Sequence, residues 1–329
     1  MKKRKSLEEY TIGILKGDRS SLAQAITLVE STLFEDRKMG TQLVQDLLPH
    51  TGNSIRIGIT GVPGVGKSTF IESFGMHLLN SGRKVAVLAI DPSSQKGKGS
   101  ILGDKTRMEK LAADERAFIR PSPSGHSLGG VSAKTREAML LCEAAGFDTI
   151  LIETVGVGQS ETAVRNMVDF FLLLMLSGAG DELQGIKKGI MEMADGLVIN
   201  KADGDNIKAS KLARQHYLQA LHLFPPNESN WYPKVELVSS TEGTGLDETW
   251  GMIEAFEQST KSKGFWRKNR ASQRSKWLEE SMYNLLLEEF SKNQSVRKVL
   301  AEFENEIESG KVSPQWLAQK ALESFLSNK

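Results

Sequence analysis

The chain has 329 residues, of which 39% are hydrophobic and 25% charged, and its formal net charge at pH 7 is +1. This length predicts one main domain with appended elements, and the composition is that of an ordinary globular protein. So small a net charge excludes a general attraction to nucleic acid or to an anionic membrane, and we expect neither as a partner. Cys142 is the single cysteine and the five histidines are scattered, which excludes an internal disulfide, gives no zinc site and favours a cytoplasmic location.

Residues 1–52 are expected to form a helical N-terminal extension. Leu22, Ile26 and Val29 recur at helical spacing, and the stretch ends at the breaker sequence PHTG, residues 49–52. The start, MKKRKSLEEY, is basic, but charged residues return before any apolar segment of the kind that a signal peptide carries. The most apolar run of the chain, FFLLLML at 170–176, is too short to cross a bilayer and fits a buried strand.

Residues 53–260 are expected to form an α/β domain. Short apolar runs alternate there with amphipathic stretches, which predicts a doubly wound, mostly parallel sheet with crossover helices. The candidate strands, in chain order, are IRIGIT, VAVLAI, FIRP, TILIET, FFLLLML, GLVIN and VELVSS.

Residues 261–329 are expected to form a helical C-terminal extension. The strand pattern stops after Trp250, and the charged sequence that follows has room for about three helices, with Gly310 and Pro314 as breaks. Two interpretations stay open: the helices pack on the sheet, or they form a dimerisation arm.

A phosphate-binding loop follows the first candidate strand and opens an amphipathic stretch, which is the strand, loop and helix order that a P-loop needs. Glycines let backbone N–H groups point at a phosphate, and the helix adds its positive N-terminal end. Lys67 is expected to bridge the β- and γ-phosphates, and the Ser68 hydroxyl to bind Mg²⁺. The expected nucleotide-binding residues here are Gly61, Val62, Pro63, Gly64, Val65, Gly66, Lys67, Ser68 and Thr69.

A guanine-reading loop is predicted where the strand GLVIN ends, at Asn200, Lys201 and Asp203. The Asp203 carboxylate can accept hydrogen bonds from N1–H and the 2-amino group of guanine, a donor pair that adenine lacks. Asn200 is expected to tie this loop to the phosphate loop, and the Lys201 stem to lie across the base. A weaker signal, Ser239, Ser240 and Thr241 after the last strand, indicates either a contact with guanine O6 or an ordinary turn.

Two carboxylates, Asp91 and Glu153, stand at the ends of candidate strands and are expected to join Ser68 in holding Mg²⁺ or its waters. Asp104 lies in a polar segment, 93–105, that is either a switch loop reaching the nucleotide or an ordinary surface loop. Glu153 and Gly156 match the Asp-x-x-Gly of Ras-like GTPases, but Val157 stands where those enzymes carry the glutamine that orients water. We therefore expect slow hydrolysis, with Gln159 as a nearby candidate for that role.

The ordered segments GVPGVGKST, DPSS, GSILGDKTRM, RPSPSGHSLGGVSAKTREA, ETVGVGQSE, SGAGDELQGIKKG and NKAD resemble the MeaB/ArgK family of G proteins. The resemblance implies a P-loop GTPase of the signal-recognition and MinD-like (SIMIBI) class, using GTP/GDP and Mg²⁺. It also implies a homodimeric chaperone of a coenzyme-B12-dependent acyl-CoA mutase, usually methylmalonyl-CoA mutase, that gates cofactor loading and protects the enzyme. Residues 181–188 would be the switch that couples hydrolysis to the mutase, so Gln184 and Lys188 join Lys67, Glu153 and Gln159 as candidate catalytic residues.

Three alternatives compete with this hypothesis. A kinase linked to amino-acid transport conflicts with a guanine-selective Asp203. A metal-insertion GTPase for hydrogenase or urease generally carries His or Cys clusters, which this sequence lacks. The third alternative is a scaffold that binds the nucleotide but hardly hydrolyses it. This alternative differs little from the main hypothesis, because Val157 replaces the glutamine that orients the attacking water in Ras-like enzymes.

Overall fold

The computed structural model describes residues 5–90, 108–121, 128–154, 159–178, 188–225 and 228–327, with the backbone alone described at 128–131, 159–160 and 188. Within these residues the chain forms one seven-stranded sheet in the order β3-β2-β4-β1-β5-β6-β7, and every neighbouring pair is parallel. The strands are β1 (Ile55–Gly61), β2 (Val85–Ile90), β3 (Ala117–Arg120), β4 (Thr149–Thr154), β5 (Phe170–Leu176), β6 (Gly196–Asn200) and β7 (Lys234–Leu237).

Each strand corresponds to one of the apolar runs that the sequence singles out, so the α/β sheet prediction is confirmed. Strand β1 is buried along its whole length, as is expected of a central parallel strand covered on both faces. Strand β3 ends at Arg120, one residue short of the expected segment, because Pro121 has no N–H to donate to the ladder.

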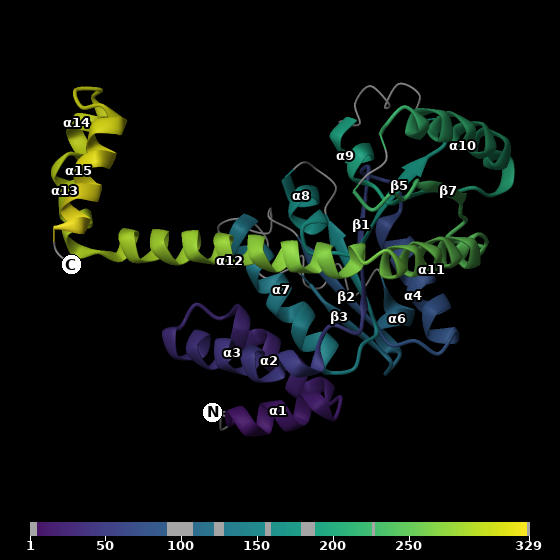
Figure 1. Cartoon of the computed structure of the whole chain (residues 1–329), viewed down its shortest axis with the longest axis horizontal. Coiled ribbons are helices and arrows are strands. Elements are labelled where there is room, and N and C mark those ends of the chain that lie inside the picture. The colour runs from purple at the N-terminus through teal and green to yellow at the C-terminus, as the bar shows by residue number, and fades with distance from the viewer. Residues whose placement is uncertain are drawn as a thin grey trace. The chain divides into compact units, whose positions relative to one another are not determined.

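Helices cover both faces of the sheet (Figure 1). One face carries α4 (Lys67–Asn80), α6 (Glu109–Ala113) and α11 (Leu246–Ser262). The other carries α7 (Leu128–Ala144), α8 (Gln159–Arg165), α9 (Lys188–Met193) and α10 (Ile207–His222), with η3 (Gly204–Asn206) leading into α10. The N-terminal helices α1 (Leu7–Leu15), α2 (Arg19–Glu30) and α3 (Phe34–Leu47) pack on α7, and η1 (Leu48–His50) leads to β1.

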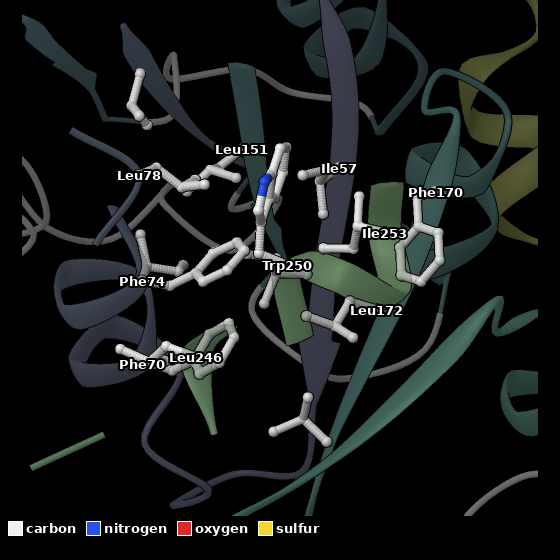
Figure 2. Packing of buried hydrophobic residues seen from close by; sticks show 14 of the residues in the cluster. Ile57, Phe70, Phe74, Leu78, Leu151, Phe170, Leu172, Leu246, Trp250 and Ile253 are labelled. Atoms are coloured by element: carbon white, nitrogen blue, oxygen red, sulfur yellow. The ribbon is translucent and has the colours of Figure 1, made fainter. Parts of the chain in front are cut away.

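The main core lies between the sheet and the helices α4 and α11. Ile57, Leu151 and Leu172 project from three neighbouring strands toward Phe74 of α4 and Trp250 of α11 (Figure 2). The Phe74 and Trp250 rings lie 6.3 Å apart, and aromatic contacts of this kind add to the stability that apolar burial provides. This packing fixes α4, and with it the loop that joins β1 to α4.

Buried ion pairs hold the amino end of the sheet. Arg270 of α12 (Phe265–Lys292) donates to both carboxylate oxygens of Asp169 at 2.7 Å, next to the start of β5. Arg56 of β1 pairs with Glu143 of α7 at 2.8 Å. Both carboxylates are almost fully buried, so removing either arginine would leave an uncompensated charge inside the protein.

The chain divides into two compact units, Met1–Gln273 and Arg274–Lys329. Within residues 261–327 the helices are α12, α13 (Gln294–Glu302), α14 (Glu304–Glu308) and α15 (Pro314–Leu326). This is one helix more than expected, because Asn293 caps a new helix by accepting from the backbone N–H groups of Ser295 and Val296. In the second unit, Val296 packs among α13 and α15 together with Leu317 and Ala321.

Among the described helices, none is long and apolar enough to cross a membrane.

Candidate functional site

The loop after β1 has glycines where a side chain would not fit. A Cβ at Gly61 would stand 2.5 Å from the carbonyl oxygen of Leu174 in β5. Gly64 and Gly66 have φ angles of 77° and 89°, in the left-handed region that favours glycine. The curled loop leads straight into α4, so the predicted order of strand, loop and helix is present.

Lys67 and Ser68 open α4 and face the end of β4. The Lys67 ammonium donates to the carbonyl oxygen of Gly61 at 2.8 Å. Burial lowers the pKa of Lys67, and the negative charges of Glu153 and Glu161 oppose that shift. The Ser68 hydroxyl donates to Glu153 at 3.3 Å, which brings together two hard oxygen donors of the kind that Mg²⁺ prefers.

The guanine-loop candidates follow β6 directly. Asn200 is 1% exposed, and its side-chain N–H donates to the carbonyl oxygen of Val65 at 2.8 Å, so it ties this loop to the phosphate loop as expected. Lys201 reaches back along the same path and donates to the carbonyl oxygen of Gly64 at 3.0 Å. Lys201 has a φ of 59°, an uncommon conformation for a residue with a side chain. Asn206 supports it by donating to the Lys201 carbonyl at 2.6 Å.

The loop after β7 contacts the guanine loop and helix α4. The hydroxyls of Ser239 and Thr241 donate to the same carboxylate oxygen of Asp203. The Ser240 hydroxyl donates to the side-chain oxygen of Asn200 at 2.7 Å. The Ser240 carbonyl in turn accepts from Ser73 of α4 at 2.5 Å.

Three of these hydrogen bonds, together with the backbone of α4, form a closed path that we call the loop ring. It runs from Val65 to Asn200, then to Ser240, then to Ser73, and back along α4 to the phosphate loop. The ring joins three of the predicted segments. On either side of Ser240, Ser239 and Thr241 donate to the Asp203 carboxylate and fix its orientation.

The remaining predicted residues differ in how much of them the structure describes. The loop residues Val62 and Pro63, and Thr69 in the first turn of α4, lie where their spacing implies. Gln159 and Lys188 each begin a helix, α8 and α9, but their side chains lie outside the described part of the chain. The candidates Asp91, Asp104 and Gln184 lie outside the described residues altogether.

Ser73, Asn206 and Glu161 also belong to the site, although no sequence pattern pointed to them. Ser73 and Asn206 carry hydrogen bonds that hold the site, and the negative charge of Glu161 in α8 raises the pKa of Lys67. Ser and Asn are common on helices and turns, so neither type gave a signal. For Glu161, its place inside the segment ETVGVGQSE was the available clue.

A family model described as "Methylmalonyl Co-A mutase-associated GTPase MeaB" matches residues 22–295. The chain belongs to the MeaB family. This MeaB protein is 52% identical over 307 residues to a probable GTPase of Mycobacterium bovis, covering 93% of the chain and 91% of the relative. It is 48% identical to GTPase ArgK of Escherichia coli over 91% of the chain and 92% of that protein. The resemblance seen in the sequence is therefore confirmed, and the chain is a GTPase of this family.

The chain is also similar to a mitochondrial protein and to a solved structure. It is 43% identical to the mitochondrial "methylmalonic aciduria type A homolog" of Mus musculus, over 99% of the chain and 81% of that protein. Its structure matches a solved structure titled "LAO/AO transport system kinase" with a TM-score of 0.76 and 39% identity, over 99% of both chains. The match over nearly the whole length supports the P-loop α/β architecture with helical regions at both ends.

Proposed function

We propose that this chain is a Mg²⁺-dependent GTPase whose nucleotide state controls its action as a chaperone of a coenzyme-B12-dependent acyl-CoA mutase. Methylmalonyl-CoA mutase is the proposed client, and the action is to gate loading of the cofactor and to protect the mutase. The observation that carries the GTPase part is the loop ring, because it joins a phosphate-binding loop to the loop after β7, whose hydroxyls hold a carboxylate suited to guanine.

In this proposal one set of groups binds the phosphates and another binds Mg²⁺. Backbone N–H groups of the phosphate loop and the Lys67 ammonium hold the phosphates. Ser68 and Glu153 would hold Mg²⁺, together with Asp91 or Asp104. When bound, the metal would supply positive charge that offsets the negative charge developing in phosphoryl transfer.

Asp203 is the proposed reader of guanine. Two hydroxyls, from Ser239 and Thr241, hold its carboxylate by hydrogen bonds, so it can accept from guanine with little loss of side-chain entropy. Both hydroxyls donate to one carboxylate oxygen, so adenine would leave the other oxygen without the donors that guanine provides, and a buried acceptor left without a partner costs about 1–3 kcal/mol.

Hydrolysis by the isolated chain is proposed to be slow. Val157 stands where Ras-like enzymes have a water-orienting glutamine, so another group must take that role. Gln159, Gln184 and Lys188 are the proposed contributors, the last two acting when a client mutase engages the segment 181–188.

The mutase as partner is supported by the family description, which names a methylmalonyl-CoA mutase-associated GTPase. The deciding experiment measures GTP hydrolysis by the purified chain with Mg²⁺, alone and with a B12-dependent methylmalonyl-CoA mutase, with ATP as the control nucleotide. Slow turnover of GTP that the mutase accelerates is the expected result. A GTP hydrolysis rate that is the same with and without the mutase would refute the proposed client. Faster hydrolysis of ATP than of GTP would refute the guanine assignment.

We also propose that the C-terminal extension, 261–329, forms a homodimer. On α12, Leu278, Met282 and Leu285 are 63%, 55% and 54% exposed and share one stripe of the helix. A second copy of the chain presenting the same stripe would bury it. Light scattering should show a dimer that Leu285→Glu converts to a monomer, whereas Asn284→Glu, on another side of α12, should leave it intact. A monomeric parent chain would contradict this proposal.

A further inference from the structure

Asn206 stands at the start of α10, and its side chain turns away from that helix. An asparagine at this position ordinarily accepts from the first backbone N–H groups of the helix. Asn206 makes no such side-chain bond to α10, a helix that the structure describes in full. Its amide contacts Lys201 and Ser177 instead, so it serves the loops at the carboxyl edge of the sheet.

Lys201 has a backbone conformation that needs support. Its φ of 59° lies in the left-handed region, which is unfavourable for a residue with a Cβ. The side-chain N–H of Asn206 donates to the Lys201 carbonyl at 2.6 Å, and the backbone N–H of Asn206 donates to the Asp203 carbonyl at 2.9 Å. One residue thus holds the backbone of two members of the guanine loop.

Ser177 follows β5 and sets the orientation of the Asn206 amide. Its hydroxyl donates to the side-chain oxygen of Asn206 at 2.6 Å. A backbone carbonyl can only accept, so the amide nitrogen of Asn206 must face Lys201 and the amide oxygen must face Ser177. By donating to that oxygen, Ser177 favours the orientation that Lys201 requires.

The backbone of Lys201 in turn sets the path of its side chain. The ammonium donates to the Gly64 carbonyl at 3.0 Å, and a Cβ at Gly66 would stand 3.8 Å from Cε of Lys201. The side chain therefore runs from the guanine loop across the phosphate loop and is held at both ends. A different backbone conformation at Lys201 would move the apolar stem that is expected to contact the base.

We propose that Asn206 and Ser177 are positioning residues for the nucleotide base, because they hold Lys201 in the conformation that lays its stem across guanine. The inference rests on the proposed function, in which Lys201 contacts the base. It adds two side chains from outside the segment NKAD to the residues that set the affinity for GDP and GTP.

The test measures the affinity of the full chain for GDP by isothermal titration calorimetry. Asn206→Ala removes the donor to the Lys201 carbonyl, and the affinity should fall about fivefold, which corresponds to about 1 kcal/mol. Lys208→Ala, at an exposed position of α10, should bind GDP as the parent chain does. Circular dichroism and thermal unfolding establish that each variant is folded. Unchanged GDP affinity in folded Asn206→Ala would overturn the inference.

A double-mutant cycle with Lys201→Gly separates positioning from a general effect on the fold. Glycine adopts the left-handed conformation readily and has no stem to place, so it does not need Asn206. In the Lys201→Gly background, Asn206→Ala should therefore leave the GDP affinity unchanged. A fivefold loss in that background as well would show that Asn206 does not act through Lys201, and would overturn the inference.

The Ser177 hydroxyl is tested by a conservative pair of variants. Ser177→Ala should weaken GDP binding, and Ser177→Thr, which keeps the hydroxyl, should restore the parent affinity. Parent affinity in Ser177→Ala would refute the part assigned to Ser177. Lys201→Gly alone tests the proposed function, since a GDP affinity equal to that of the parent would refute Lys201 as a contact of the base, whatever the Asn206 variants do.

Discussion

Alanine in place of Asn200 removes the amide that joins the phosphate loop to the guanine loop. Two partners lose a hydrogen bond, namely the Val65 carbonyl at 2.8 Å and the Ser240 hydroxyl at 2.7 Å. Because Asn200 is 1% exposed, both partners are left in a region that water reaches poorly. A buried polar group without a partner costs about 1–3 kcal/mol, so the free energy of unfolding should fall by about 2–6 kcal/mol.

The same change should weaken GDP binding, because the phosphate loop then loses one of its two side-chain contacts with the guanine loop. Denaturant unfolding gives the stability, and isothermal titration calorimetry with GDP gives the affinity. Asn80→Ala, at the exposed last residue of α4, is the matched control and should change neither. A loss below about 1 kcal/mol together with unchanged GDP affinity would refute the argument that these two bonds hold the site.

Three further changes test other parts of the molecule. Asp203→Asn should reduce the preference for GTP over ATP in competition binding, and an intact preference would show that another group reads the base. Arg270→Ala leaves Asp169 charged and buried, and should lower the free energy of unfolding by about 3–5 kcal/mol, whereas exposed Arg267→Ala should have little effect. Burial raises the pKa of Glu137 from 4.5 to about 7, so the folded chain binds this proton more tightly than the unfolded chain does. Stability should therefore fall as pH rises from about 4.5 to about 7. Glu137→Gln should lack that part of the pH profile, and identical profiles would contradict the assignment.

Strands and strand ends were the predictable part of this structure. A strand buried on both faces requires an unbroken apolar run, and FFLLLML and VAVLAI became β5 and β2 with those bounds. Parallel strands place their carboxyl ends at one edge, so Gly61 and Asn200 were expected to lie close together. The hydrogen bond from Asn200 to Val65 follows from that geometry.

Contacts between residues far apart in sequence were not predictable. Arg270 and Asp169 are separated by 101 positions, and Arg56 and Glu143 by 87, with no spacing rule to join them. Ser73 meets Ser240 through a hydroxyl on one helix and a carbonyl in a distant turn, and such pairs depend on how α4 and β7 are placed. Glu161 belongs to the segment ETVGVGQSE, but its burial was not predictable, because it depends on how α8 packs on β1, where Val164 lies against Gly58.

The loop ring also has a thermodynamic consequence for the two ends of a nucleotide. A base that orders Asp203 and Asn200 also restrains Val65, and a phosphate that orders the loop around Val65 restrains Asn200 in return. Coupling of this kind is reciprocal, so guanine must favour phosphate binding by the same factor as phosphate favours guanine binding. Guanosine and pyrophosphate, given together as separate fragments, would then bind cooperatively. The affinity for an intact nucleotide would therefore exceed what independent binding of its base and its phosphates provides.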